Sequence, residues 1–114
     1  MLGMAHDFRV MRVDRGYYCF PEVDIHIPFT PGVAALIQAK LTPAAAVEAM
    51  TTGRRYGGAD AEAIGVVSAT APEGKVTSTA VDVVAPLKGK DPGTLLAIKS
   101  TMFASVTAAL RGKV

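Results

Sequence analysis

One glutamate, Glu22, stands in a segment that would surround a carboxylate with apolar side chains. Its neighbours within four residues are mostly apolar, namely Tyr18, Cys19, Phe20, Pro21, Val23 and Ile25. Burial among such neighbours disfavours the charged form of a carboxylate, which suits a general base that takes up and returns a proton near neutral pH. Glu22 is therefore a candidate for proton-transfer chemistry, and an exposed carboxylate at the end of a strand is the alternative that the residues alone allow.

The other polar residues give weaker signals. Asp24 lies two residues beyond Glu22, where a strand would turn it to the same side, and we interpret it as an exposed or capping carboxylate. The two histidines, His6 and His26, have no carboxylate at a spacing that implies a relay, which favours structural roles. The single cysteine, Cys19, cannot form an internal disulfide and has no second Cys or His at metal-ligand spacing. We therefore expect no metal site and, by default, a reduced cytoplasmic setting.

Length and charge limit the class of protein. The chain has 114 residues, enough for one domain with a core, and its 12 basic and 10 acidic residues give a net charge of +2. Its densest basic cluster, Arg9, Arg12 and Arg15, is typical of a solvated strand face and forms no stripe that would follow a nucleic-acid backbone. No apolar run reaches ~18 residues, and charge appears too early for a signal peptide. We expect a soluble protein with neither a nucleic-acid nor a membrane partner.

The N-terminal part predicts short strands around the candidate glutamate. Residues 1–6 are small and apolar without a capping residue, as at the end of a helix. Apolar and basic residues alternate over residues 8–13, which predicts a strand, and Asp14-Arg15-Gly16 predicts a turn. Residues 17–20 predict a second strand that ends at Pro21.

The rest of the chain predicts helices. Thr30 and Thr42 each precede a proline, a start signal for helices over residues 31–40 and 43–51, and Gly53 is a stop signal for the second. Residues 59–64 predict a short helical piece and residues 65–67 a brief strand or extended run. Apolar residues at helical spacing predict a helix over residues 75–87 and, after a polar loop, a final amphipathic helix over residues 94–111.

Three stretches together resemble the crotonase superfamily of enoyl-CoA hydratases and isomerases. MLGMAHDFRVMRV, residues 1–13, is similar to the family's helix that ends in a small residue and Asp before a strand. FPEVDI, residues 20–25, resembles the family's segment with the dipeptide PE. TGRR, residues 52–55, with the small residues after it and GVV at 65–67, resembles a third family signature. The run AHDFRVMRVDRGYYCFPEVDI further resembles the plant-type and actinobacterial branch of Δ3,Δ2-enoyl-CoA isomerases.

The resemblance implies a fold and a set of site residues. The fold would be α/β: the C-terminal half of a crotonase-like spiral ββα fold, one unit in which residues 1–41 end the core and residues 42–114 form a mainly helical trimerisation region. Glu22 would be the catalytic base that moves a double bond from C3 to C2 of an acyl-CoA. Phe20 and Pro21 would contact substrate, and Lys99 would approach the CoA phosphates. No cofactor is implied beyond the CoA thioester itself, and the partner would be further copies of the chain, as a trimer or a dimer of trimers.

Two alternatives stay open. Hydratases of the family use a second glutamate six residues before the Asp that ends the helix, and Met1 stands at that position here. Methionine cannot activate water, which favours the isomerase. His26 and the single glycine of IPFTPGVAALI also depart from the hydratase pattern.

The oxyanion-hole donors that the resemblance implies lie before Met1, so we expect residues 1–114 to belong to a longer parent chain and to be nearly inert alone. A non-catalytic remnant or assembly subunit is the other alternative.

Overall fold

In the part of the chain that the structure describes, the sheet consists of two short strands. The computed structural model describes residues 1–112, and in it β1 (Val10–Arg12) pairs in parallel with β2 (Ala69–Ala71), with Met11 opposite Thr70. The predicted strand over residues 8–13 is confirmed at its centre. The predicted strand over residues 65–67 is wrong, because the amides of Val66 and Val67 both donate to the Ala61 carbonyl and hold these residues in the turn that follows a helix.

The segment before the candidate glutamate is also less regular than expected. Residues 17–20 do not form a strand, since only Tyr18 pairs, in an isolated antiparallel bridge with Tyr56. Pro21 then begins a 3₁₀ turn, η2 (Pro21–Val23), because its fixed φ suits a first helical position. The N-terminal residues form another 3₁₀ turn, η1 (Leu2–Ala5), which contributes the buried side chain of Met4.

The two helices predicted from Thr-Pro start signals are confirmed. They are α1 (Pro31–Lys40) and α2 (Pro43–Thr52). Thr30 and Thr42 cap them, and each hydroxyl accepts a hydrogen bond from the backbone N–H three residues later, at 3.4 and 3.2 Å. Gly53 ends α2 with φ of 66°, a left-handed conformation that favours glycine.

Four further helical elements follow within residues 58–110, and one of them corrects a prediction. These are α3 (Gly58–Ala63), α4 (Val76–Val84) with its extension η3 (Ala85–Leu87), α5 (Pro92–Met102) and α6 (Ala104–Leu110). The predicted continuous helix over residues 94–111 is broken at Phe103, where α5 and α6 meet at 67°. It also begins earlier, because Asp91 caps it and accepts from the Thr94 N–H at 2.9 Å.

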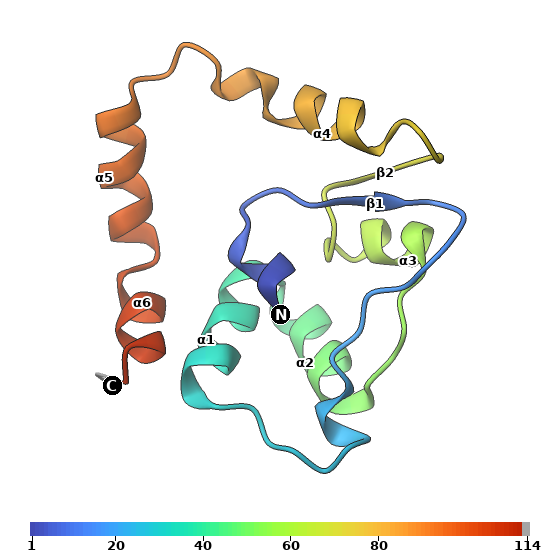
Figure 1. Ribbon diagram of the computed structural model, residues 1–114. Coiled ribbons are helices and arrows are strands. Elements are labelled where there is room, and N and C mark those ends of the chain that lie inside the picture. Colours follow the sequence, from blue (N-terminus) through green and yellow to red (C-terminus); the bar gives the residue numbers. More distant parts are fainter. Residues whose placement is uncertain (113–114) are drawn as a thin grey trace.

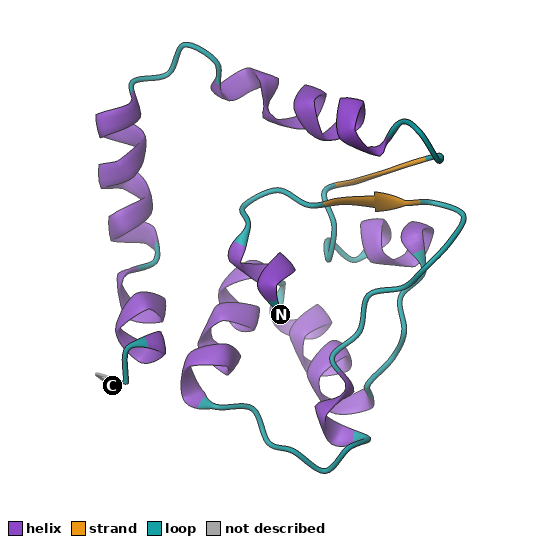
Figure 2. Cartoon of the chain, in the orientation of Figure 1, coloured by secondary structure: helices purple, strands orange, loops and turns teal. Residues whose placement is uncertain are grey.

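Helices α3 and α4 lie on the two sides of the small sheet (Figure 2), and the core lies between η1, α1, α2 and α3. Its largest fully buried side chains are Met4, Phe20, Ile37, Tyr56 and Val66. Helix α6 packs on α1 so closely that a Cβ on Gly32 would lie 2.8 Å from the Leu110 Cα. From β2 the chain continues as α4 and α5, which arch around the core before α6 returns to it (Figure 1).

Within the described residues, no single helix is both long and apolar enough to cross a membrane. The bent pair α5 and α6 reaches the necessary length and apolar composition only when the two helices are taken together.

Candidate functional site

The Glu22 side chain lies partly buried on the 3₁₀ turn η2. Its Oε2 atom is shielded from solvent and has no hydrogen-bond partner among the described residues. Buried carboxylate oxygens are nearly always hydrogen-bonded, so an unpaired one marks a position for a ligand, a water molecule or a proton. The geometry therefore leaves Glu22 available for chemistry in a way that no other carboxylate of residues 1–112 shares.

Phe20 and Pro21 play different parts in holding this turn. Phe20 is 1% exposed and packs edge-to-face against Tyr18 and Phe29, at centroid distances of 5.7 and 6.5 Å. It anchors the segment in the core, directly before the glutamate. Pro21 is exposed and starts the 3₁₀ turn. Contact of either residue with substrate stays a prediction.

The C-terminal end of α2 packs against the same turn. A Cβ on Gly53 would lie 2.5 Å from the Asp24 Oδ2 and 3.3 Å from the Val23 Cγ1, so only a glycine lets η2 come this close. Asp24 is exposed and has helical backbone angles, φ −76° and ψ −26°. The interpretation of Asp24 as an exposed or capping carboxylate is confirmed, since it is the exposed C-cap of η2, and no strand carries it and Glu22. The stretch PEV and the stretch TG, distant in sequence, thus meet in space.

The Tyr18 hydroxyl is a second buried polar group without a partner in the described part of the chain, and it was not predicted from the sequence. The Tyr18 hydroxyl is shielded from solvent, lacks a hydrogen-bond partner among residues 1–112, and lies where a Cβ on Gly3 would approach it to 2.5 Å. Burial raises the pKa of the Tyr18 phenol, partly offset by the nearby charge of Arg9. A tyrosine in an apolar run looks like an ordinary core residue, so the sequence carries no signal for this orphan hydroxyl.

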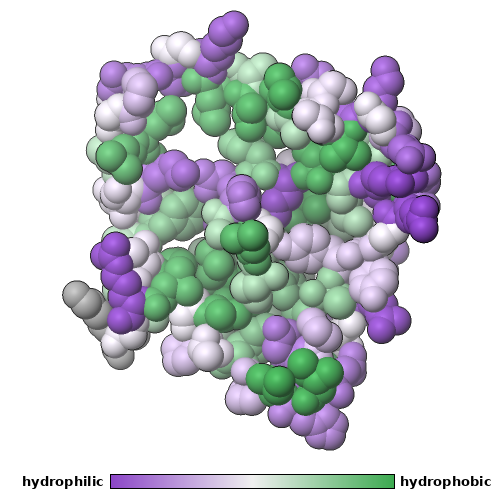
Figure 3. Space-filling view, viewed as in Figure 1, coloured by the Kyte–Doolittle hydropathy of each residue, from purple (hydrophilic) through white to green (hydrophobic). Residues whose placement is uncertain are grey.

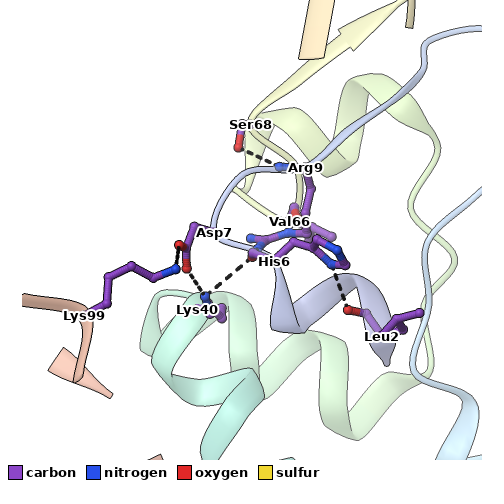
Figure 4. A network of polar contacts seen from close by, with 8 residues as sticks. All are labelled: Leu2, His6, Asp7, Arg9, Lys40, Val66, Ser68 and Lys99. Atoms are coloured by element: carbon purple, nitrogen blue, oxygen red, sulfur yellow. Dashed lines mark hydrogen bonds and ion pairs between the residues drawn. The ribbon is translucent and has the colours of Figure 1, made fainter. Parts of the chain in front are cut away.

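Lys99 lies elsewhere, in an ion-pair cluster between α5 and the core (Figure 4). Both Lys99 and Lys40 reach the carboxylate of Asp7, with Lys40 Nζ at 2.9 Å from Oδ1. The hydrogen bond from Lys99, with that from Lys40, outweighs burial and lowers the pKa of Asp7. The cluster faces a groove of about 700 Å³ whose lining includes Asp7, Lys40 and Lys99 but not Glu22. A role of Lys99 in binding phosphate stays a prediction.

Two of the remaining polar candidates, Arg9 and His6, make hydrogen-bond contacts within the fold. Arg9 donates through Nε to the Val66 carbonyl and through Nη1 to the His6 carbonyl, both at 2.7 Å, and so ties β1 to the turn after α3 (Figure 4). The expected solvated face therefore does not hold for Arg9, which is half-buried. His6 contacts the Leu2 carbonyl at 3.1 Å, while His26 is exposed with φ of 62°. No cluster of three or more His, Cys, Asp or Glu in the described chain is placed to hold a metal ion.

Comparison with known proteins identifies relatives of the whole stretch. A family model described as enoyl-CoA hydratase/isomerase matches residues 1–113. The enoyl-CoA delta isomerase 2, peroxisomal, of Arabidopsis thaliana is 36% identical over 72 residues, which cover 62% of this chain and 30% of that protein. The enoyl-CoA delta isomerase 3 of the same plant is 36% identical over 83 residues, covering 69% and 35%.

Solved structures share the fold. The human mitochondrial delta3-delta2-enoyl-CoA isomerase superposes with a TM-score of 0.88 at 21% identity, over 96% of this chain and 43% of that one. A Mycobacterium tuberculosis protein, named an enoyl-CoA isomerase in one structure and a probable enoyl-CoA hydratase in another, gives 0.86 in the first at 22% identity, over 98% and 49%. An enoyl-CoA hydratase of Mycobacterium marinum gives 0.85 at 22% identity, over the same shares.

The extent of these matches defines what is shared. The chain spans about a third of the curated relatives and about half of the solved structures. The expected α/β class, a few strands followed by helices, is confirmed by the superpositions. The resemblance on residues 1–13, 20–25 and 52–67 is confirmed by the family model, which covers all three stretches. The chain is therefore a member of the enoyl-CoA hydratase/isomerase family, the crotonase superfamily, and corresponds to one half of its fold.

Proposed function

We propose that this chain is part of an acyl-CoA enzyme that shifts the double bond of a 3-enoyl-CoA to the 2-trans position, with Glu22 as the base. The reaction removes a proton from C2, passes through an enolate and returns a proton at C4. A single carboxylate can carry out both transfers if it lies between the two carbons. The observation that carries the proposal is the Glu22 Oε2 atom, which is buried yet unpaired with any described residue.

The surrounding architecture supports this role. Phe20 fixes one side of η2 in the core, and Gly53 allows its other side to dock on α2, so the turn holds Glu22 from both directions. A base held in this way loses little conformational entropy when the substrate binds, which favours a productive geometry. The curated relatives at 36% identity carry isomerase names, and this favours the same reaction for the present chain.

Hydration is the second candidate, because several of the fold relatives are named as hydratases. Adding water to a double bond needs a second group to activate the water, and the family resemblance places that glutamate where Met1 stands. A thioether accepts hydrogen bonds weakly and does not take up a proton near neutral pH. We therefore favour isomerisation over hydration.

Further parts of the proposal concern the whole protein. The substrate would be a CoA thioester without another cofactor, and the protein would be a homo-oligomer. A cytoplasmic location stays a prediction, and the names of two relatives are peroxisomal and mitochondrial. The oxyanion donors implied by the resemblance are not among the 114 residues, and losing even one such donor typically costs ~100-fold to 1,000-fold in rate. Residues 1–114 assayed alone should therefore show very slow turnover, and ordinary turnover would contradict this expectation.

The decisive experiment replaces Glu22 in the longest in-frame gene product that contains residues 1–114. Glu22→Gln keeps the shape of the side chain but removes the base, so the conversion of 3-enoyl-CoA to the conjugated 2-enoyl-CoA should fall by ~100-fold to 10,000-fold. Binding of a saturated acyl-CoA, measured by calorimetry, should persist. The matched control is Asp24→Asn, an equally small change two residues away on an exposed side chain, which should leave the rate within about twofold.

The alternatives give different results in the same assay. Undiminished isomerisation in Glu22→Gln would remove the proposed role of Glu22. Addition of water to a 2-enoyl-CoA at a rate above isomerisation would identify a hydratase. Failure of the unmodified protein to bind acyl-CoA would favour a non-catalytic assembly subunit.

A further inference from the structure

The ring of Tyr18 links the N-terminal turn η1 to the segment that carries Glu22. At its tip, the hydroxyl lies in the space that a Cβ on Gly3 would fill, 2.5 Å from that position, and the ring atoms Cε2 and Cζ lie 3.3 Å from it. Along its side, the ring packs edge-to-face on Phe20, with the two centroids 5.7 Å apart. One side chain thus touches both η1 and the residue from which η2 begins.

Tyr18 is held firmly in this position. Its N–H donates to the Tyr56 carbonyl, and its carbonyl accepts from the Tyr56 N–H, both at 2.8 Å. Tyr56 is itself 0% exposed and bonded through its hydroxyl to Glu48. The ring of Tyr18 cannot turn aside without leaving Phe20, which is 1% exposed. Since a tyrosine side chain has only two torsions, these contacts determine where its tip lies.

The turn η1 on the other side of the contact is also fixed. Its Met4 side chain is fully buried, and hydrophobic side chains gather over η1 near the middle of the face that Figure 3 shows. The Met4 amide donates to the Met1 carbonyl at 2.9 Å, and the His6 amide donates to the Gly3 carbonyl at 3.1 Å. The contact between Gly3 and Tyr18 therefore lies between two supports that are both packed into the core.

Hydrogen bonding within the described residues does not explain the Tyr18 hydroxyl. It is shielded from solvent and unpaired among residues 1–112, and burying an unpaired hydroxyl costs free energy that a phenylalanine would not incur. A tyrosine at this position is thus unfavourable for stability alone. What the hydroxyl supplies is its size, because it fills the space that a glycine at position 3 leaves open.

The same contacts determine where Glu22 lies. Phe20 is the N-cap residue of η2, so Pro21 and Glu22 follow it in a single 3₁₀ turn. The Ile27 N–H closes this region by donating to the Glu22 carbonyl at 3.0 Å. A closed turn moves as a unit, so a shift of Phe20 is passed on to Glu22.

We propose that Tyr18 is a positioning residue for Glu22, and that its hydroxyl, seated against Gly3, sets the place of the carboxylate in the reaction of the proposed function, on which this inference rests. Proton transfer depends steeply on geometry, and a misplacement of about 1 Å can cost ~100-fold in rate. The contact is of that size. A Cβ at position 3 would have to lie 3.4 Å from the hydroxyl for ordinary van der Waals contact in place of 2.5 Å, a separation of about 0.9 Å.

The test is a double-mutant cycle in the longest in-frame gene product that contains residues 1–114. Gly3→Ala should lower kcat ~100-fold, because its Cβ displaces the Tyr18 ring. Tyr18→Phe should lower kcat ~3-fold to 10-fold, because the tip of the ring loses its support. The double variant should recover to within about threefold of Tyr18→Phe, since removal of the hydroxyl makes room for the Cβ, whereas two independent effects would multiply to ~300-fold to 1,000-fold.

Two readouts separate positioning from a general loss of stability. Binding of a saturated acyl-CoA, measured by calorimetry, should stay within about threefold in all variants, so that the loss appears in kcat and not in KM. The urea midpoint of Tyr18→Phe should equal or exceed that of the unmodified protein, since an unpaired hydroxyl is removed. A midpoint that fell together with the rate would reduce Tyr18 to a structural role and overturn the proposal. If Gly3→Ala does not fold, the double variant should still fold and reach the rate given above.

The matched controls are Gly57→Ala and Tyr17→Phe. Gly57 has an ordinary φ of −67° and nothing within 4 Å of an added Cβ, and Tyr17 is 57% exposed. Both should keep kcat within about twofold. Unchanged rates in Gly3→Ala and Tyr18→Phe, or a double variant as slow as the product of the single effects, would overturn this inference alone. An unmodified protein without isomerase activity, or full activity in Glu22→Gln, would overturn the proposed function as well.

Discussion

At the scale of single residues, Tyr56 is a buried phenol whose titration the fold opposes. It is 0% exposed, and its hydroxyl donates to Glu48 Oε1 at 2.9 Å. Burial first, and then the bond to the Glu48 carboxylate, raise the pKa of Tyr56 from 10.0 to about 12. Because the folded state holds this proton more tightly, its contribution to stability is complete below pH 10 and is lost as the pH rises toward 12.

The expected alkaline loss is about 2 to 3 kcal/mol of unfolding free energy. Tyr56→Phe should cost about 1 kcal/mol at pH 7, since one hydrogen bond is lost, and should lose less stability than the unmodified chain above pH 10. Urea unfolding at several pH values measures both effects. Tyr17→Phe, at a tyrosine 57% exposed, is the control and should behave as the unmodified chain. Equal alkaline loss in Tyr56→Phe would show that other groups cause it.

The Asp7 cluster gives the opposite pH dependence. The hydrogen bonds from Lys99 and Lys40 lower the pKa of Asp7 below its ordinary 3.8, so their stabilisation is present above pH 3.8 and is lost as the pH falls through the lower, folded value. Asp7→Asn should destabilise the chain by about 1 kcal/mol near pH 7, because the ion pairs are partly exposed and screened. The difference from the unmodified chain should shrink below pH 3.8 in urea unfolding experiments. A constant difference across this range would point to packing as its cause.

The sequence located the candidate base but not its surroundings. The apolar neighbours and the proline before Glu22 predicted a partly buried carboxylate, and the structure agrees. The orphan hydroxyl of Tyr18 and the pairing of Lys99 with Asp7 depend on contacts with residues far along the chain. Such contacts follow from tertiary packing, which residue types and local spacing do not specify.

At the scale of elements, the sequence predicted the helices that local signals define, but it did not predict the pairing of strands that lie far apart in the chain. The Thr-Pro caps of α1 and α2 act within four residues, so the sequence placed both helix starts correctly. Strand β2 pairs with β1 across 59 residues, and the apolar stretch GVV next to it was the stronger local pattern. Val66 and Val67 are buried in the core and not in a sheet, which explains why their apolar pattern wrongly predicted a strand.

Gly53 joins the site to α2 and gives a prediction at this scale. Gly53→Ala should cost about 1 to 2 kcal/mol for the left-handed backbone, and more because its Cβ would lie 2.5 Å from Asp24 Oδ2. Gly65→Ala is the matched control: its φ is 82°, but nothing lies within 4 Å of the added Cβ. Only Gly53→Ala should also displace η2, and with it Glu22, and so lower the isomerase rate of the longer gene product. Equal urea midpoints for the two variants would contradict the close approach.

At the scale of the whole molecule, packing is unevenly distributed. Buried side chains come mainly from residues 4–71, with Val106 of α6 as the further contribution from the C-terminal part. Helix α6 packs against α1, whereas α4 and α5 have no buried residue among the described positions. Local opening costs least where few apolar contacts are lost, so α4 and α5 should open before the core.

Amide hydrogen exchange tests this order at a concentration low enough to keep the chain monomeric. Amides of α5 should exchange faster than those of α1 and α2, because opening α5 exposes little additional apolar surface. Helix α6 provides an internal control, since it follows α5 after the bend at Phe103 but holds Val106 at 7% exposure. We therefore expect protection to rise again within a few residues of Phe103. Uniform protection from α5 through α6 would mean that the two helices open as one unit, and that the bend does not separate an uncovered helix from a packed one.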